Sequence, residues 1–396
     1  GDHRDLHSFP TRRSYDLSCL SLPRHSNTEN TVFYVAPNGN DTWSGQFAKP
    51  KSHDGPFATL ARARDAIREL KRTKGLEKSV IVYVRGGTYY LDRPLEFSPE
   101  DSGSTPFPIT YSAYPNEKPS ISGGLMIQSP LTKNPNGSYE IAIPSVSKGE
   151  WYFYQLFVNG ERRTRARTPN DGMYKITGGV QLEGPARFTF QEGEIKKEWA
   201  GRGDVDVIGL AKWAEIRMPI VEVNETDRTV ILTKQVPPSN WSGEEPRYWI
   251  ENAPESLDQP GEWRLDKHTG ILSLLLKKDE NPDIMQMIAP RLEHVIHIQG
   301  NPDKNLFVSN IRFRGLSFSH TSAPQLQEGY PDTQAAHDIS AAFEAKGARN
   351  CRIEQCRFTQ LGNYAIAFTQ GCSDNEIVGN EIADVGAGGI KIGEGE

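Results

Sequence analysis

The stretch NIRFRGLSF, residues 310–318, decides the fold because it recurs further along the chain. It aligns without gaps on NCRIEQCRF at 350–358, where the Asn, the Arg and the closing Phe are identical. IVGNEI at 377–382 repeats the pattern, and LGNYAI at 361–366 is matched 24 residues later by VGAGGI at 385–390. A period of roughly 20–30 residues without helical spacing indicates a solenoid of stacked β coils.

The repeat also predicts details of one corner of the coils. Asn350 and Asn375 are expected near the same corner, where their side-chain amides could form a ladder between coils. The first two copies are 40 residues apart, which implies a loop insertion from Thr321 to Ser340. Insertions on one coil often build the binding face, so we expect this loop to contribute to a site.

The N-terminal part predicts further coils and a helical lid. Short strands turned by Gly, Pro and Asn follow one another, and the apolar run at 80–84 is typical of a strand buried on both sides of a parallel sheet. Between them, apolar residues from Leu60 to Leu70 fall on one helical face, with Thr59 as N-cap and Gly75 as the end. Such a helix would cover the free edge of the first coil.

Between 125 and 288 the pattern changes to strands separated by charged loops, with six of the seven tryptophans. We interpret this stretch as an inserted antiparallel β domain. The opening residues 1–17 show no hydrophobic period and resemble translated sequencing-adaptor sequence. The predicted organisation is a non-native or disordered leader at 1–30, a cap with the first coils at 31–124, the inserted domain at 125–288, and further coils at 289–396.

Composition excludes several classes of protein. The net charge is −6 without a basic stripe, which argues against nucleic-acid binding. No apolar run approaches the roughly 20 residues of a membrane span. The four cysteines show neither disulfide nor zinc spacing, so we expect them to be small core residues. The Arg202-Gly203-Asp204 tripeptide is interpreted as a chance match to an integrin motif.

Several segments resemble glycoside hydrolase family 141, which is related to family 120. The segments are FYVAPNGNDTWSG (33–45), GPFATLARARDAI (55–67), VNGERRTRAR (158–167), GEWRLDKHTGILSL (261–274) and GAGGIKIGE (386–394). The resemblance covers roughly residues 30–396. It implies a right-handed parallel β-helix with an inserted β domain, and fucosidase, xylanase or xylosidase activity on plant cell-wall glycans outside the cytoplasm.

Glycoside hydrolysis needs two carboxyl groups that face each other across a groove. Asp384, before the Val385-Gly386 turn, and Glu394, at the end of the last strand, are the candidate catalytic acids. In the resembling families the catalytic acids come from coils beyond a segment similar to GAGGIKIGE. We therefore expect this chain to be C-terminally truncated, with its true catalytic acids beyond residue 396.

Polar residues at the loop insertion are candidate substrate-binding groups because sugar hydroxyls need fixed donors and acceptors. These residues are His320, Asp332, His337 and Asp338. In VNGERRTRAR, alternation places Arg163, Arg165 and Arg167 on one strand face. That face could bind a carboxylate-bearing sugar, although a salt-bridged face is the simpler interpretation.

The sequence leaves three functions open: a glycoside hydrolase of complex polysaccharide, a polysaccharide lyase on the same scaffold, and a non-catalytic glycan-binding surface protein. We expect no cofactor, with calcium only under the lyase alternative. The expected partner is a polysaccharide or oligosaccharide, with no nucleic acid and no membrane span. We expect a secreted, periplasmic or cell-surface protein that is monomeric when full-length.

Overall fold

The computed structural model describes residues 30–128, 130–181, 183–210, 214–235, 246–323, 329–331 and 336–393. The leader predicted at 1–30 lies outside these residues except for Asn30. The fold is mostly β, with two α-helices in the described part, α1 (Leu60–Lys74) and α2 (Pro144–Ser147). No helix in the described ranges is long and apolar enough to cross a membrane.

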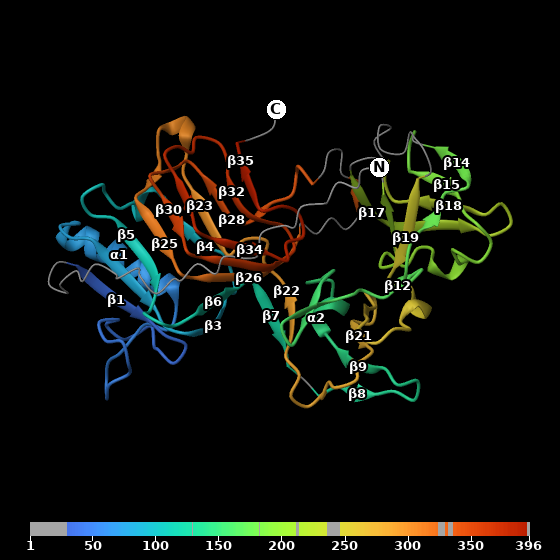
Figure 1. Cartoon of the computed structure of the whole chain (residues 1–396), viewed down its shortest axis with the longest axis horizontal. Coiled ribbons are helices and arrows are strands. Elements are labelled where there is room, and N and C mark those ends of the chain that lie inside the picture. Colours follow the sequence, from blue (N-terminus) through green and yellow to red (C-terminus); the bar gives the residue numbers. More distant parts are fainter. Residues whose placement is uncertain are drawn as a thin grey trace, which may run out of the picture.

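Three parallel sheets form one body of the molecule, seen on the left of Figure 1. Sheet A contains β1 (Thr31–Val35), β2 (Val80–Val84), β5 (Ile109–Ala113), β25 (Ile311–Arg314), β30 (Arg352–Glu354) and β33 (Glu376–Val378). Sheet B contains β3 (Gly87–Tyr90), β6 (Pro119–Ser122), β26 (Ser317–Thr321), β31 (Arg357–Leu361) and β34 (Glu381–Ala383). Sheet C contains β4 (Leu95–Phe97), β23 (Ile296–Gln299), β28 (Ala341–Lys346), β32 (Tyr364–Phe368) and β35 (Ile390–Ile392). A short parallel pair, β24 (Val308–Ser309) and β29 (Ala348–Arg349), lies before β25 and β30.

From β2 onward the chain visits sheets A, B and C in turn, and each such pass is here called a coil. The alignment read from the repeat is confirmed, because Phe313 pairs with Ile353 and Ile353 pairs with Ile377. In sheet B, Phe318 stacks on Phe358 with ring centroids 4.9 Å apart. Apolar side chains of all three sheets form one buried cluster, so each coil rests on the core of its neighbour.

The corner ladder forms differently from the prediction. Asn350 lies beside Asp374 rather than Asn375, because the offset between these coils is 24 residues and Arg349 bridges Ser373. Asn350 and Asp374 both adopt positive φ, at 52° and 57°. Asn375 instead accepts from Cys351 N (2.9 Å) and donates to Ala348 O (2.9 Å). The coils are therefore joined here by side chain to backbone, which satisfies backbone groups that the corner leaves unpaired.

The helix α1 covers the first coil, as the amphipathic pattern predicts. Leu60, Ala63 and Ile67 are buried in the same core as sheet A. The Thr59 side chain accepts from Arg62 N (3.1 Å), which confirms the N-cap, and Gly75 ends the helix at φ 74°. The prediction that the strand at 80–84 is buried on both faces is wrong. Its residues alternate between buried and half-buried, because the outer face of the sheet is covered only in part.

The strands between 124 and 290 pair antiparallel and lie largely on the other side of Figure 1. One sheet joins them to the coils through β7 (Gly124–Ile127), β22 (Met287–Pro290), β10 (Leu156–Val158) and β11 (Glu161–Arg163). A second contains β8 (Thr132–Lys133), β9 (Tyr139–Ala142), β21 (Ile271–Leu274) and β20 (Trp263–Leu265). The largest contains β12 (Arg167–Thr168), β19 (Arg247–Glu251), β16 (Asp206–Leu210), β17 (Glu215–Asn224), β18 (Thr229–Leu232), β15 (Arg187–Thr189) and β14 (Gly178–Gln181), with β13 (Tyr174–Lys175) and β27 (Tyr330–Pro331) at its side.

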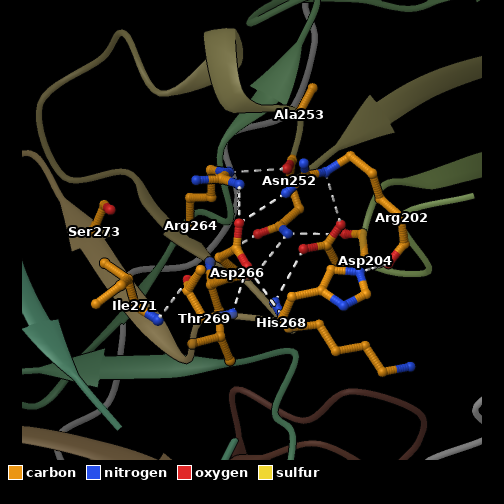
Figure 2. A network of polar contacts seen from close by, with 12 residues as sticks. Arg202, Asp204, Asn252, Ala253, Arg264, Asp266, His268, Thr269, Ile271 and Ser273 are labelled. Atoms are coloured by element: carbon orange, nitrogen blue, oxygen red, sulfur yellow. Dashed lines mark hydrogen bonds and ion pairs between the residues drawn. The ribbon is translucent and has the colours of Figure 1, made fainter. Parts of the chain in front are cut away.

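A buried polar network holds two of these sheets together, and Figure 2 shows it from close by. Asp204, 1% exposed, accepts from Arg202 (3.2 Å) and from Lys267 N (3.0 Å). Burial opposes ionisation of Asp266, but hydrogen bonds from Thr269 and the guanidinium groups of Arg264 and Arg202 outweigh it, so the pKa of Asp266 lies far below its usual value. The Arg202-Gly203-Asp204 tripeptide is thus part of the packing of the insertion.

Cys351 and Cys356 are free thiols and buried core residues, as predicted. Burial raises the pKa of the Cys351 thiol to about 11 and that of Cys356 to about 12. Such thiols are protonated at neutral pH and are therefore poor nucleophiles.

Candidate functional site

A cavity of about 280 Å³ lies where the coils, the loop insertion and the antiparallel insertion meet. The antiparallel strands supply its charged and polar groups, whereas the coils and the loop supply mainly small or apolar ones. Its lining residues are Tyr154, Gln155, Asp206, Glu215, Arg217, Ala323, Gly329, Tyr330, Ala336, Ile339, Gly362, Gly386 and Ala387. Five of these come from the loop predicted at 321–340, and within that loop β27 pairs with β17.

One face of the largest antiparallel sheet is polar where it meets the cavity. Asp206 on β16 pairs with Glu251 on β19. Ile208, two residues after Asp206 on β16, pairs with Arg217 on β17. Successive residues of a strand point to opposite faces, so these polar side chains share one face. The intervening residues Val207 and Ile250 pack into the apolar core on the other face.

The charged groups on this face are paired. Arg165 Nη1 lies 2.5 Å from Asp206 Oδ2, and Arg217 Nη1 lies 2.6 Å from Glu251 Oε2. Burial alone would raise the pKa of Glu251, but Arg217 and Arg165 outweigh it and lower that pKa to about 2. Tyr152 accepts from Arg165 Nη2 at 2.9 Å. The pairs hold charged side chains in fixed positions beside the cavity.

Glu215 differs from its charged neighbours, because within the described residues its side chain makes no hydrogen bond or ion pair. Its side chain is open to the cavity, and the protein walls around that cavity reduce its hydration. Although Glu215 is exposed to the cavity, the surrounding protein partly desolvates its carboxyl and thereby raises its pKa, while Arg217 opposes the shift. A raised pKa favours the neutral form of a carboxyl, and that is the form that can donate a proton.

Two acceptor atoms beside the cavity lack protein partners in the described part of the chain. They are Asp206 Oδ1 and Gln155 Oε1, and both atoms are buried. A buried acceptor without a hydrogen bond costs free energy, so it is usually satisfied by water or by a ligand. Their chemistry suits hydroxyl donors.

The coils leave room for the cavity through two glycines stacked at one corner. A Cβ on Gly386 would lie 2.3 Å from Gly362 O, and a Cβ on Gly362 would lie 2.6 Å from Ala323 N. Any larger residue would collide with the neighbouring backbone. The GAGGIKIGE segment therefore begins with a glycine that close packing of adjacent coils requires.

Two predicted site residues lie at one corner of sheet B. His320, Gln360 and Asp384 occupy equivalent positions in three successive coils. All three have a positive φ, of 58°, 57° and 51° respectively. His320 is 6% exposed, and burial lowers its pKa to about 4. Asp384 is exposed and its Oδ1 lies 2.7 Å from Arg162 Nε. Neither residue lines the cavity, although Asp384 precedes the lining Gly386 by one intervening residue.

The other predicted residues are more peripheral or lie outside the described ranges. His337 and Asp338 are exposed and bind each other, with Nδ1 2.9 Å from Oδ1. Asp332 and Glu394 fall outside the described residues. The arginine face predicted for 163–167 is interrupted, because β11 ends at Arg163 and β12 begins at Arg167.

Sequence reasoning missed Asp206, Glu215 and Arg217. The available signal was a charged residue placed inside otherwise apolar strands, as in DVDVIGL (204–210) and AEIRMPIV (214–221). A charge at such a position must be paired or functional when the strand is buried.

No family model matches the chain, and no curated protein matches it. Among solved structures, one described as a glycoside hydrolase superposes with a TM-score of 0.78 at 22% identity, over 91% of this chain and 67% of that one. Another, described as the complex structure of XylC with xylose, gives a TM-score of 0.42 at 13% identity, over 91% of this chain and 56% of that one. The first likeness shows that this chain shares the fold of that structure.

Proposed function

We propose that the chain is a glycoside hydrolase of plant or other complex polysaccharide, with fucosidase-, xylanase- or xylosidase-like activity, on a right-handed parallel β-helix resembling family 141. The proposed fold is supported by the A–B–C order of the strands and by the parallel register between coils. The antiparallel insertion matches what the resemblance implies. The described cavity would be the sugar-binding site.

The observation that carries the proposal is the contrast between two carboxyl groups of the cavity. Asp206 is held by Arg165 and keeps one oxygen without a protein partner, whereas Glu215 is unpaired and its pKa is raised. Glycosidases use two carboxyl groups whose surroundings separate their roles. Here Glu215 would protonate the glycosidic oxygen of the leaving group.

The second carboxylate would stabilise positive charge on the sugar ring or activate water. Asp206 is the candidate within the cavity, and Asp384 is the candidate from the coils. Glu394, the other acid predicted from its position at the end of the last strand, remains a candidate and lies outside the described residues.

Activity of Glu215→Gln on chromogenic fucosides and xylosides and on plant polysaccharide tests this assignment. The amide keeps the shape but cannot donate the proton, so kcat should fall about 10²–10⁴-fold. Glu222→Gln, an exposed change on the same strand, should leave kcat unchanged. Asp206→Asn and Asp384→Asn then identify the second carboxylate, with circular dichroism to check folding.

The same assays separate the alternatives. Release of reducing ends without ultraviolet absorbance of an unsaturated product supports a hydrolase, and appearance of that absorbance supports a lyase. Oligosaccharide binding without any turnover supports a non-catalytic glycan-binding protein. Full activity of Glu215→Gln would overturn the role given to this residue. A monomeric protein acting outside the cytoplasm remains part of the proposal.

A further inference from the structure

Two histidines and a glutamate come together on sheet C, outside the cavity. His297 on β23 is the register partner of Glu344 on β28, and His294 lies just before β23. One potential ligand atom from each of the three residues lies within 4.8 Å of the others, and all three side chains are half-buried. The parallel register therefore places two imidazoles and a carboxylate on one patch of the sheet.

Backbone contacts already orient two of these groups. His294 Nδ1 lies 2.7 Å from Ala341 O, and a carbonyl oxygen can only accept, so Nδ1 carries the proton and Nε2 keeps its lone pair. Glu344 Oε2 accepts from Ala341 N at 3.2 Å. Metal-binding histidines usually donate their other ring N–H to a carbonyl or carboxylate, and ligating carboxylates are themselves hydrogen-bonded.

The third group is held by stacking and by an amide. The His294 and His297 rings stack with centroids 4.7 Å apart and planes 24° apart, and Gln299 Nε2 lies 2.8 Å from His297 Nδ1. With that amide turned so that its oxygen accepts from Nδ1, the His297 Nε2 lone pair is available to a ligand. Amide nitrogen and oxygen exchange places by a simple rotation.

We propose that His294, His297 and Glu344 bind a divalent transition metal ion of the zinc class. Two imidazole nitrogens and one carboxylate are a donor set that suits this class rather than calcium or magnesium. Tetrahedral coordination needs ligand atoms about 3.4 Å apart, so small side-chain rotations must close the present spacing. Water would fill the fourth position, or Glu96, the register partner of His297 on β4.

The ion would have a structural role. The strand β4 precedes the antiparallel insertion, and β23 and β28 follow it. A metal ion held by His294, His297 and Glu344 would tie β23 to β28 after the insertion, and with Glu96 as fourth ligand it would also tie them to β4 before it. This site is independent of the proposed hydrolase activity and goes beyond the expectation of no cofactor.

Isothermal titration of the metal-free protein with Zn²⁺, together with thermal unfolding, tests the proposal. One ion should bind per chain and raise Tm, because binding only to the folded state stabilises it. His297→Ala and Glu344→Gln should weaken that binding at least 10-fold and remove the rise in Tm. His53→Ala, an exposed histidine elsewhere, should behave as the unmodified protein.

Co²⁺ provides a second readout that separates this site from the cysteines. Visible d–d bands without a thiolate charge-transfer band would support imidazole and carboxylate ligation. Zn²⁺ binding that is equally strong in His297→Ala, thiolate bands with Co²⁺, or no binding at all would overturn the proposal. Equal Tm of the metal-free variants and the metal-free unmodified protein shows that the substitutions leave the fold intact.

Discussion

The coils and the antiparallel insertion are stabilised in different ways. The coil core consists of apolar side chains stacked from one turn to the next, with polar contacts at the corners. The insertion has an apolar core too, but it buries ion pairs such as Arg165–Asp206 beside the cavity. The residues of the coils therefore follow a repeated structural pattern, whereas the insertion buries charged side chains that stability alone does not require.

The largest effect is expected from breaking the buried ion pair. Asp206→Leu removes the nearest carboxylate from the buried Arg165 guanidinium and leaves only Glu251 at 3.6 Å, and we expect the free energy of unfolding to fall by about 3–5 kcal/mol. The Arg165→Met/Asp206→Leu double variant should recover most of this loss, because no unpaired charge remains. Urea unfolding of the three proteins measures it. An equal loss in single and double variants would show that the pair itself stabilises the insertion.

We expect the free energy of unfolding to depend on pH through His320, which lies at the boundary of the two regions with its ring against the ring of Phe157. Its folded-state pKa of about 4 lies below the ordinary 6.5, so the unfolded chain binds more protons between these values. The free energy of unfolding should therefore be highest above pH 6.5 and fall by about 2–3 kcal/mol towards pH 4.

The His320→Gln variant isolates this contribution from the carboxyl groups that titrate in the same range. The difference in unfolding free energy between the unmodified protein and the variant should change across pH 4–6.5 and stay constant above it. A constant difference over the whole range would contradict the buried neutral histidine.

Within the coils, the corner contact of Asn375 gives a smaller effect. Asn375→Ala removes the partners of Cys351 N and Ala348 O, and we expect a loss of about 1–3 kcal/mol in the free energy of unfolding. Asn38→Ala, an exposed asparagine, serves as the control and should stay within about 0.5 kcal/mol. Chemical denaturation checks both variants, and equal stability would exclude a structural role for the corner.

The smallest effect is expected at the helix that covers the first coil. Thr59→Ala removes the acceptor for Arg62 N, and the N-cap is worth about 1 kcal/mol. Thermal unfolding measures the loss, and Thr59→Ser should retain most of the stability because its hydroxyl can make the same bond. A Ser variant as unstable as the Ala variant would show that the methyl group matters more than the cap.

The sequence could predict the coils because equivalent residues of a stacked repeat lie in contact. The offsets of 40 and 24 residues between Phe318, Phe358 and Ile382 appear directly as parallel register. The same offsets bring His320 and Asp384 to one corner. A one-residue error in aligning Asn350 was enough to misplace the corner ladder, since neighbouring residues there point in different directions.

The sequence by itself determined the parallel register of the coils and the helix over the first coil, because each depends on local periodicity or on a repeat. Only the tertiary structure decided that Glu215 and Asp206 meet Gly386 across a cavity, or that His294 and His297 lie beside Glu344. The cavity contacts join segments that share no repeat and no period, and the repeat visible in the sequence does not extend to the strands that carry His297 and Glu344. They are set by how the chain packs after the insertion, and no local pattern encodes that arrangement.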